Sequence, residues 1–395
     1  MATSLDSKID SLAAQIQSLT AEVQNDDAAR KKLLGTTMAA MGQLETPLET
    51  VWKIIMSPHA PSALMSLIKL GVIEHLAKAP APMSSAELSK ATGGDQVLIV
   101  RLCRPLLPQG IIAEVDAELY AATPITKLLT DPVIVGGYTF MFSCPSHTLT
   151  QMPQYLQDNG WKNVNGYPGP FQAAKSTKLT MWPWLCEHPD LLNHFAKFMG
   201  GQRMMRIDWF NFLPIAEMML NGAKKNSEAV LMVDVGGGEG HDIEKFHKAF
   251  PDAPGQLVLQ DLPDVIGMIK DLHPAVRRMP HDFFQEQPVT GARVYYLRSI
   301  MHDWGDDDCV KILRRIADAM TSGYSKVFLN EFILPAKDVP MYPSLLDINM
   351  MCILNGMERT EKQWIELLAK AGLRVVRFHT VQNVENEGLI EAELM

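Results

Sequence analysis

A glycine-rich turn between an apolar strand and a helix limits what this chain can fold into more than any other feature. Residues 231–246 read LMVDVGGGEGHDIEKF, in which a strand-like run ends at Val235 and a helical pattern follows Gly240. Glycines in such a turn allow a ligand to approach the backbone closely. The spacing G-G-G-E-G differs from the G-x-G-x-x-G of pyrophosphate-binding turns. The turn alone leaves a ligand site and a purely structural role open.

Strand-like runs alternate with amphipathic segments from Val230 to the end of the chain. The runs are VLMVDV, QLVLQ, RVYYLR, KVFLNEF, LRVVRFH and GLIEAEL. This alternation predicts a mostly parallel sheet covered by helices on both faces. No helix-length gap separates the last two runs, so we expect them to form an antiparallel hairpin at the sheet edge. The expected fold class is α/β, with a Rossmann-like sheet over residues 226–395.

The N-terminal residues follow a different pattern. Residues 1–35 predict an amphipathic helix whose apolar residues are spaced alternately by four and three, so that they form one stripe. The stripe consists of Leu5, Ile9, Leu12, Ile16, Leu19 and Val23. It is too short for a strong independent coiled coil, so it should pack on a partner subunit or on its own domain.

Residues 36–135 predict short helices followed by a β-hairpin, which is a winged-helix-like arrangement. Ser84 and Glu87 form an S-x-x-E capping box at the start of one helix. Such a module could bind DNA, but residues 62–134 hold six Lys and Arg against seven Asp and Glu. That balance lacks the phosphate contacts from which DNA-binding proteins draw their affinity. We therefore expect a dimerisation domain, followed by a helical region over 136–225 that lines a substrate pocket.

Carboxylates follow successive strands of the predicted sheet. Asp261 lies about 20 residues after the last glycine of the turn, a spacing that suits a carboxylate accepting from ribose hydroxyls. Asp282 follows the next strand, where it could face an adenine amino group with Phe283 against the ring. Each carboxylate alone is more often a helix cap or part of a solvated turn. Together, at one sheet edge, they favour an adenosyl ligand.

A histidine follows the strand RVYYLR, in the sequence SIMHDWGDDDC. His302 should lie at the carboxyl edge of the sheet, and Glu331 and Glu358 come to the same edge from later segments. Carboxylates near an imidazole orient the ring and stabilise the imidazolium that forms when it takes a proton. These three residues are therefore our candidates for a general base and its supporting pair.

Composition and charge exclude several classes of function. A net charge of −9 argues against a protein that binds nucleic acid through phosphate neutralisation. No run of about 18 apolar residues could span a membrane, and the N-terminal residues lack a signal-peptide core. The five cysteines are far apart and form no C-x-x-C pair, which predicts reduced, mostly buried thiols. We expect a cytoplasmic protein.

Six motifs occur together in one order: DVGGGEG, QDLP, HDFF, HDW, LNEF and GMERT. In this order and spacing they resemble the plant-caffeate-type, S-adenosylmethionine-dependent O-methyltransferases, especially those of fungal secondary metabolism. The resemblance covers nearly the whole chain. It implies an N-terminal dimerisation domain and a homodimer, S-adenosyl-L-methionine as the cofactor, and transfer of a methyl group to a small-molecule hydroxyl without a metal.

The resemblance also implies roles for individual residues. His302 matches the family's catalytic base, and Glu331 and Glu358 match the pair that positions it. The implied cofactor-binding residues are Gly236, Gly238, Asp261, Leu262, Asp282, Phe283, Arg298 and Trp304. The family commonly has Lys where this chain has Arg298, and the planar, bidentate guanidinium changes the geometry of that contact.

The implied acceptor pocket is apolar. Its candidate residues are Phe195, Met199, Gln202, Met351, Asn355 and His147. Phe and Met at helical spacing are core residues more often than ligand contacts, so a purely structural role stays open for these side chains. Five of the 24 methionines, Met301 among them, fall on segments expected to border this pocket.

Two other functions remain open at this point. Some fungal relatives use the same fold and cofactor for pericyclic or dehydration reactions without methyl transfer. The presence of His302, Glu331 and Glu358 favours transfer over that alternative. A winged-helix regulator would need basic residues on its third helix, where the sequence has only Arg101 and Arg104.

Overall fold

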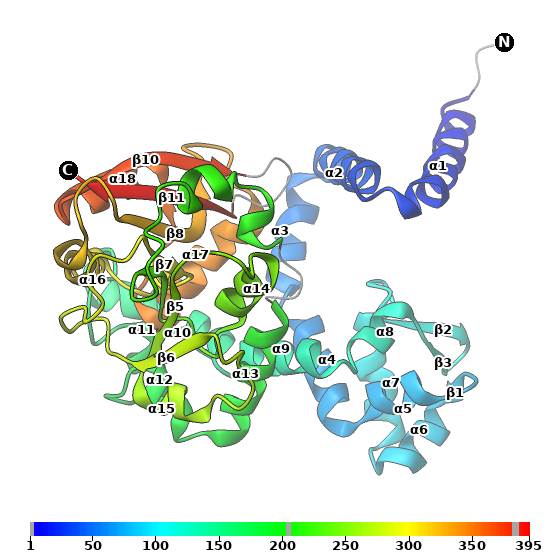
Figure 1. Cartoon of the computed structure of the whole chain (residues 1–395). Coiled ribbons are helices and arrows are strands. Elements are labelled where there is room, and N and C mark those ends of the chain that lie inside the picture. Colours follow the sequence, from blue (N-terminus) through cyan, green and yellow to red (C-terminus); the bar gives the residue numbers. More distant parts are fainter. Residues whose placement is uncertain (1–3, 203–206, 381–386) are drawn as a thin grey trace. The chain divides into compact units, whose positions relative to one another are not determined.

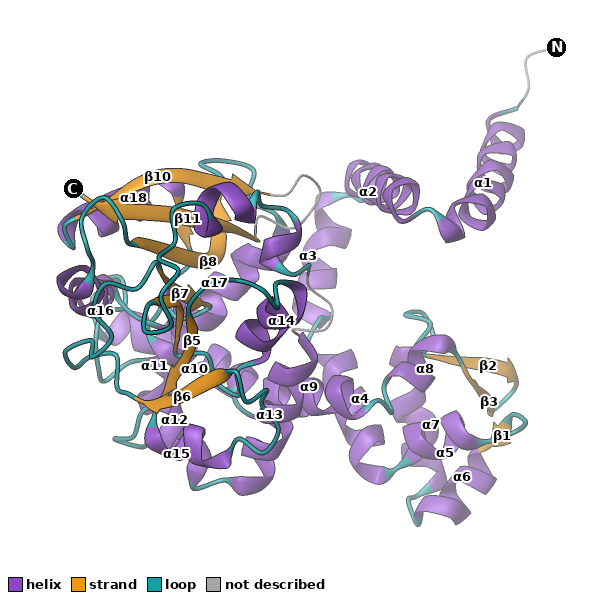
Figure 2. Cartoon of the chain, viewed as in Figure 1, coloured by secondary structure: helices purple, strands orange, loops and turns teal. Residues whose placement is uncertain are grey.

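A computed structural model of the chain describes residues 4–202, 207–380 and 387–395 (Figure 1). The chain divides into two units, Met1–Leu128 and Leu129–Met395. The first unit is mainly helical, whereas the second contains the large sheet and the helices that cover it (Figure 2).

The N-terminal segment is two helices and not the single one predicted within residues 1–35. Helix α1 spans Leu5–Glu22, a 3-10 turn follows, and α2 spans Asp27–Leu44. The break occurs because Asp26 has an extended backbone, with φ of −121°, and its carboxylate caps α2 by accepting from the Ala29 N–H at 3.0 Å. The predicted apolar stripe lies on α1. Neither α1, α2 nor α3 (Pro47–Met56) buries a residue, so their apolar side chains are largely exposed.

The rest of the first unit has helices followed by a hairpin, in the predicted order. The elements are α4 (His59–Leu70), α5 (Val72–Lys78), β1 (Met83–Ser84), α6 (Ser85–Thr92), α7 (Gln96–Cys103), β2 (Ile112–Asp116), β3 (Leu119–Ala122) and α8 (Pro124–Leu128). The three strands form one small sheet in the order β1-β3-β2. The predicted capping box of Ser84 and Glu87 is confirmed at the start of α6.

The second unit begins with a helical segment. Its helices are α9 (Pro132–Ser143), α10 (Pro145–Asp158), α11 (Pro170–Lys175), α12 (Met181–Cys186) and α13 (Pro189–Gln202), followed by a 3-10 turn (Trp209–Asn211) and a π-helix (Ala216–Leu220). The turn NVNGYPGP, residues 163–170, connects α10 to the start of α11. Apolar side chains of this segment form one cluster with residues of α17 (Met341–Leu354).

The large sheet confirms the predicted topology. Its strands are β4 (Val230–Val235), β5 (Gln256–Asp261), β6 (Val276–Pro280), β7 (Val294–Arg298), β8 (Lys326–Leu334), β10 (Leu373–Thr380) and β11 (Glu387–Leu394). They lie in the order β10-β11-β8-β7-β4-β5-β6, and the short β9 (Arg359–Thr360) pairs with β8. The pairs within β4–β8 are parallel, whereas β10 and β11 form the expected antiparallel hairpin.

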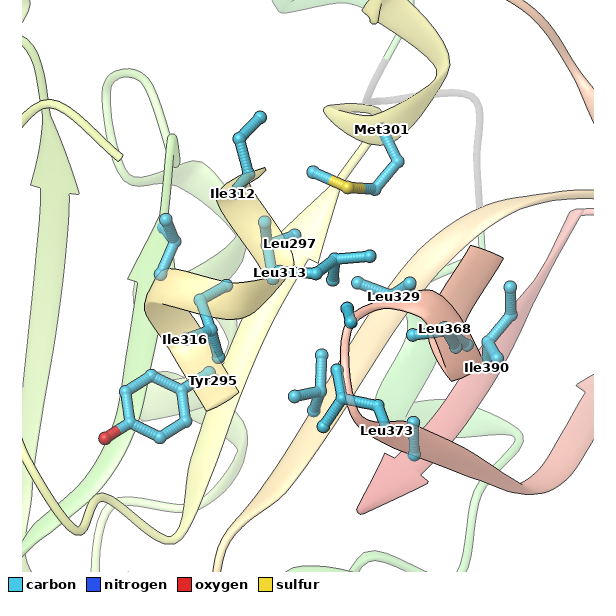
Figure 3. Close-up of a cluster of buried hydrophobic side chains, with 14 of the residues drawn as sticks. Tyr295, Leu297, Met301, Ile312, Leu313, Ile316, Leu329, Leu368, Leu373 and Ile390 are labelled. Carbon is cyan, nitrogen blue, oxygen red and sulfur yellow. The ribbon is translucent and has the colours of Figure 1, made fainter. Parts of the chain in front are cut away.

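Hydrophobic clusters pack on both faces of this sheet, because successive side chains of a strand point to opposite faces. Tyr295 and Leu297 of β7 belong to one cluster, whereas Val294 and Tyr296 belong to the other. The first cluster includes α16 (Asp306–Ala319) and α18 (Glu361–Lys370) (Figure 3). The second includes α14 (His241–Ala249), α15 (Pro263–Met268) and the aromatic residues of the 3-10 turn at 209–211.

Parallel strands bring their carboxyl ends to the same edge of a sheet. The glycine turn follows β4, Asp261 ends β5, Asp282 follows β6 and His302 follows β7. The topology therefore gathers at one edge the groups that are dispersed over some 70 residues of sequence.

The cysteines and the length of the apolar helices can be described for both units. Four of the five cysteines are buried and all five are free thiols, while Cys186 is exposed. In the parts of the chain that the structure describes, no helix is both long enough and apolar enough to cross a membrane.

The sheet core yields a stability prediction. Leu329 is fully buried on β8 within the first cluster, so Leu329→Ala should lower the free energy of unfolding by about 2–5 kcal/mol through lost burial and a residual cavity. The matched control Val376→Ala, at a half-exposed position of β10, should change it by less than about 0.5 kcal/mol. Urea unfolding followed by tryptophan fluorescence measures both, and equal losses would contradict this description of the core.

Candidate active site

The candidate base lies on a 3-10 turn, Met301–Asp303, that follows β7. Glu331, on the neighbouring strand β8, holds the start of this turn through the backbone. Its Oε1 accepts from the N–H of Ile300 at 3.0 Å and from the N–H of Met301 at 2.8 Å. A carboxylate that accepts two backbone N–H groups fixes the direction in which the turn leaves the strand.

The segment after α17 holds the turn from a second side. The Met357 N–H donates to the carbonyl of His302 at 3.0 Å, and Glu358 Oε1 lies 2.7 Å from His302 Nδ1. A Cβ at Gly356 would lie 2.0 Å from the His302 carbonyl oxygen. Only glycine allows so close an approach, which explains why glycine precedes Met357.

The imidazole of His302 lies between two carboxylates. Its Nδ1 is bound to Glu358, whose side chain is fully buried, and its Nε2 lies 3.3 Å from Asp303 Oδ1. Because Glu358 occupies Nδ1, Nε2 is the nitrogen that can take a proton from an acceptor. Sequence reasoning assigned no role to Asp303, although it stands next to the base in the motif HDW.

The carboxylates decide the protonation of this ring. Burial alone lowers the pKa of His302, but Asp303, the hydrogen bond with Glu358 and the charge of Glu331 outweigh it and raise the pKa to about 10. Burial also raises the pKa of Asp303 to about 6 and that of Glu331 to about 7, against the charge of His302. His302 is therefore an imidazolium at neutral pH in this state.

Glu331 and Glu358 have different roles, although the resemblance treats them as a pair. Glu358 bonds the ring, whereas Glu331 acts on the ring through the backbone of the turn and through its charge. Within the described residues, no donor reaches the second oxygen of either carboxylate. Both oxygens are buried beside the base.

The glycine turn and Asp261 form one hydrogen-bonded unit. The Gly238 N–H donates to Asp261 Oδ2 at 2.8 Å, and the Leu262 N–H donates to Oδ1 at 2.7 Å. Gly236 and Gly238 have φ of 72° and 61°, values that favour glycine. A Cβ at Gly236 would lie 2.8 Å from Ile300 Cδ1, so the turn also borders the segment that carries the base.

Aromatic side chains lie at the same edge, with Phe283 next to the glycine turn. Phe283 packs edge-on against Trp304, with ring centroids 6.0 Å apart. Asp282 caps its own turn by accepting from the Phe284 N–H at 3.0 Å, which is the alternative that the sequence left open. Close backbone, a carboxylate and aromatic rings are the groups that an adenosyl ligand requires, so the residues present fit such a ligand. Their individual contacts to it stay predictions.

Arg298 is engaged within the protein. Its guanidinium pairs with Asp242 in the first turn of α14 at 2.8 Å and with Glu387 of β11 at 3.4 Å. The side chains of Arg298 and Asp242 are both buried. The arginine therefore links the helix after the glycine turn to the end of β7, while its contact to a cofactor stays a prediction.

The candidate acceptor residues come from three helices. Phe195 of α13 packs edge-on against Phe140 at 4.9 Å and Trp182 at 5.4 Å, and Met199 follows one turn later. Gln202 ends α13, but its side chain lies outside the described residues. His147 of α10 is exposed, and its Nε2 lies 3.3 Å from the Ala174 carbonyl oxygen.

Asn355 links α17 to the turn NVNGYPGP. It is buried in the left-handed conformation, with φ of 58°, and its Nδ2 donates to the carbonyl of Gly166 at 2.7 Å. The Tyr167 hydroxyl donates to the Leu354 carbonyl at 3.2 Å. These two hydrogen bonds place the turn beside the end of α17, and Asn355 lies four residues after the candidate Met351.

Met301 does not border the acceptor site as predicted. Its side chain is fully buried in the cluster between the sheet and α16, where Figure 3 labels it. The prediction was wrong because the side chain of Met301 packs into this core, although Met301 lies on the same 3-10 turn as His302. Among the described residues, no group of three or more His, Cys, Asp or Glu side chains is placed to hold a metal ion.

Two protein-family models match this chain. A family model of the O-methyltransferase domain matches residues 215–374, and a model of the O-methyltransferase dimerisation domain matches residues 52–132. The chain is 38% identical to O-methyltransferase asqD of Emericella nidulans, over 82% of this chain and 84% of the relative. It is 35% identical to O-methyltransferase penC of Penicillium thymicola, over 93% and 92%.

Two solved structures extend the similarity to nearly the full length. The complex of LepI with SAM has a TM-score of 0.87 at 26% identity, covering 99% of this chain and 100% of LepI. A pericyclic reaction enzyme has a TM-score of 0.86 at 26% identity, covering 98% and 100%.

The contact between Asp303 and His302 yields a prediction. Asp303→Asn should lower the pKa of His302 below about 10, because Asp303 is the largest contribution that raises it. NMR titration of the imidazole resonances measures this shift, with His302→Gln to assign the signal. Asp307→Asn, at an exposed position on the first turn of α16, is the matched control and should leave the titration unchanged. An unshifted pKa in Asp303→Asn would contradict the contact.

Proposed function

The chain belongs to the S-adenosylmethionine-dependent O-methyltransferases, and we propose that it methylates a hydroxyl of an aromatic or polyketide-like molecule in secondary metabolism. His302 is the general base in this proposal. The observation that carries it is the imidazole at the carboxyl edge of the sheet, with Nδ1 held by Glu358 at 2.7 Å and with the glycine turn beside its segment.

The residues at this edge divide into those that bind the cofactor and those that act on the acceptor. When bound, S-adenosylmethionine supplies a methyl group activated by a positively charged sulfur. We assign Gly236, Gly238, Asp261 and Leu262 to its amino-acid and ribose moieties. Asp282, Phe283 and Trp304 are assigned to the adenine, and Arg298 to a supporting position. Their value to catalysis is alignment, since holding two reactants in line removes much of the entropic barrier.

His302 removes the proton of the acceptor hydroxyl at Nε2 as the oxygen attacks. Glu358 at Nδ1 keeps the ring oriented and, together with Asp303, stabilises the imidazolium that results. A positioned base of this kind contributes roughly 10²–10⁴-fold to a rate. Because the pKa of His302 is about 10, the neutral ring is a minority at pH 7. The rate of proton removal should therefore rise with pH up to that value. No step in this scheme is assigned to a metal.

The acceptor class follows from the candidate side chains. Phe195 and Met199 of α13 with Met351 of α17 provide apolar surface, which suits a flat, bulky molecule. Asn355 offers a buried amide for a polar group of the acceptor, and His147 and Gln202 complete the proposed set. The nearby turn NVNGYPGP sets the position of Asn355 through Gly166.

A second candidate is a pericyclic reaction that uses the bound cofactor without methyl transfer. The similarity to a pericyclic reaction enzyme at a TM-score of 0.86 supports it. The hydrogen-bonded pair of His302 and Glu358 favours methyl transfer, because a ring-forming rearrangement has no hydroxyl proton to remove.

The proposal includes a homodimer formed through the N-terminal domain, with no nucleic acid or membrane partner. The match of residues 52–132 to the dimerisation-domain model supports it, as do the exposed apolar side chains of α3 at the start of that range. The free, mostly buried thiols suit a reducing compartment, and we place the protein in the cytoplasm.

The test of this function is mass spectrometry on incubations with S-adenosylmethionine and a panel of phenols and phenolic polyketides. Methyl transfer yields a product heavier by one methyl group together with demethylated cofactor. A product of unchanged mass without demethylated cofactor would favour the pericyclic alternative and contradict methyl transfer.

His302→Gln tests the base within the same assay. It should retain cofactor affinity by calorimetry and lose turnover by about 10²–10⁴-fold, because only the proton acceptor is removed. His75→Gln, at an exposed position of helix α5 in the first unit, is the matched control and should keep wild-type turnover. Unchanged turnover in His302→Gln would remove His302 from the mechanism.

A further inference from the structure

The arginine next to Glu358 forms hydrogen bonds with the backbone of the turn that carries the base. Arg359 is fully buried on β9. Its Nη1 donates to the carbonyl of Met301 at 3.0 Å, and its Nη2 donates to the carbonyl of Trp304 at 2.9 Å. These carbonyls belong to Met301, the residue before His302, and to Trp304, the residue after Asp303. One guanidinium therefore binds the backbone on both sides of His302 and Asp303.

The guanidinium is itself held in place. Asp306 Oδ1, in the first turn of α16, accepts from Nε at 3.1 Å and from Nη2 at 3.0 Å. The ring of Trp364 lies 5.3 Å from the guanidinium carbon. With a carboxylate on one side and an aromatic face packed against it, the planar group has little freedom to turn.

Two neighbouring residues in sequence therefore control one imidazole by different routes. Glu358 bonds Nδ1 directly, whereas Arg359 bonds the backbone on either side of the ring. Glu331 also restrains this turn, because it accepts hydrogen bonds from the N–H groups of Ile300 and Met301. Glu331 of β8 therefore binds N–H groups at the start of the turn, whereas Arg359 of β9 binds the carbonyls of Met301 and Trp304.

We propose that Arg359 is a positioning residue for the base: it fixes both ends of the turn and so sets the imidazole of His302 against Glu358. This inference rests on the proposed function for its effect on turnover, but not for its effect on the ring. Lysine cannot replace it, because one ammonium on a flexible stem does not span two carbonyls and a carboxylate in fixed directions.

The chain offers a matched control in Arg293, at the opposite end of β7. Arg293 is also buried, and its guanidinium donates to the backbone carbonyls of Met219, Asn221 and Tyr324. Arg293→Lys should disturb packing as Arg359→Lys does, but it lies at the amino edge of the sheet, away from the base. The comparison separates a positioning effect from a general loss of stability.

The closing experiment is NMR titration of His302 in both variants without acceptor. Asp303, Glu331 and Glu358 are the charged groups that face the ring, and in Arg359→Lys the turn no longer holds it against them. We expect the pKa of His302 to fall by about one unit or more in Arg359→Lys and to keep its wild-type value in Arg293→Lys. A wild-type pKa in Arg359→Lys, or equal shifts in both variants, would overturn the proposal.

Asp306→Ala keeps the proposal testable if Arg359→Lys does not fold. Asp306 has a half-exposed side chain, and its removal frees one side of the guanidinium. We expect a smaller shift of the His302 pKa in the same direction, and no shift would overturn the proposal.

Turnover of a phenol that is active in the panel tests whether the position of His302 affects methyl transfer. Arg359→Lys should lower kcat by roughly 10- to 100-fold, within the range that a positioned base supplies, while cofactor affinity and acceptor KM stay within a few-fold of wild type. A shifted pKa without any methyl transfer in the wild-type enzyme would reject the proposed function and leave the positioning role intact. A shifted pKa with unchanged kcat would confine Arg359 to structure and overturn its role in the reaction.

Discussion

The site depends on one buried hydrogen bond, between His302 Nδ1 and Glu358 at 2.7 Å. It joins a turn after β7 to a segment more than fifty residues later, and each side is fixed by further bonds to the backbone. Glu331 binds N–H groups of the turn, and the Met357 N–H binds the carbonyl of His302. The imidazole is thus oriented by the main chain of the sheet edge as much as by its own partner.

Burying these charges has a cost that the arrangement must offset. A lone buried carboxylate is strongly disfavoured, which is why burial raises the pKa of Asp303 and of Glu331. The imidazolium of His302 lies among these carboxylates and compensates for part of that cost. The carboxylates that raise the pKa of His302 would also stabilise the proton that the ring takes up during a reaction. The same charge interactions therefore serve both the folded state and the proposed catalysis.

Most of the sheet could be predicted from the sequence, because buried parallel strands are short apolar runs whose ends are marked by glycine or charge. The bounds of β4 were predicted to the residue, and the edge hairpin followed from the short gap before β11. Side-chain partners were harder. Asp303 is next to the base in the motif, yet its position 3.3 Å from Nε2 depends on the folded turn. Met301 was assigned to the pocket because a turn residue's direction depends on the local 3-10 geometry, which apolar periodicity does not report.

The sequence by itself determined the fold class, the order of the strands along the chain and the set of chemical groups at the carboxyl edge. Those follow from local patterns: periodicity, glycine at the turn and charges at strand ends. The tertiary structure alone decided which groups bond to one another. Glu331 and Glu358 look alike in sequence, but the register of β8 beside β7 directs one to the backbone, while β9 directs the other to the ring. In the motif GMERT, nothing distinguishes Arg359 from an ordinary charged residue. Its hydrogen bonds to Met301 and Trp304 form only because two segments that are distant in sequence pack together.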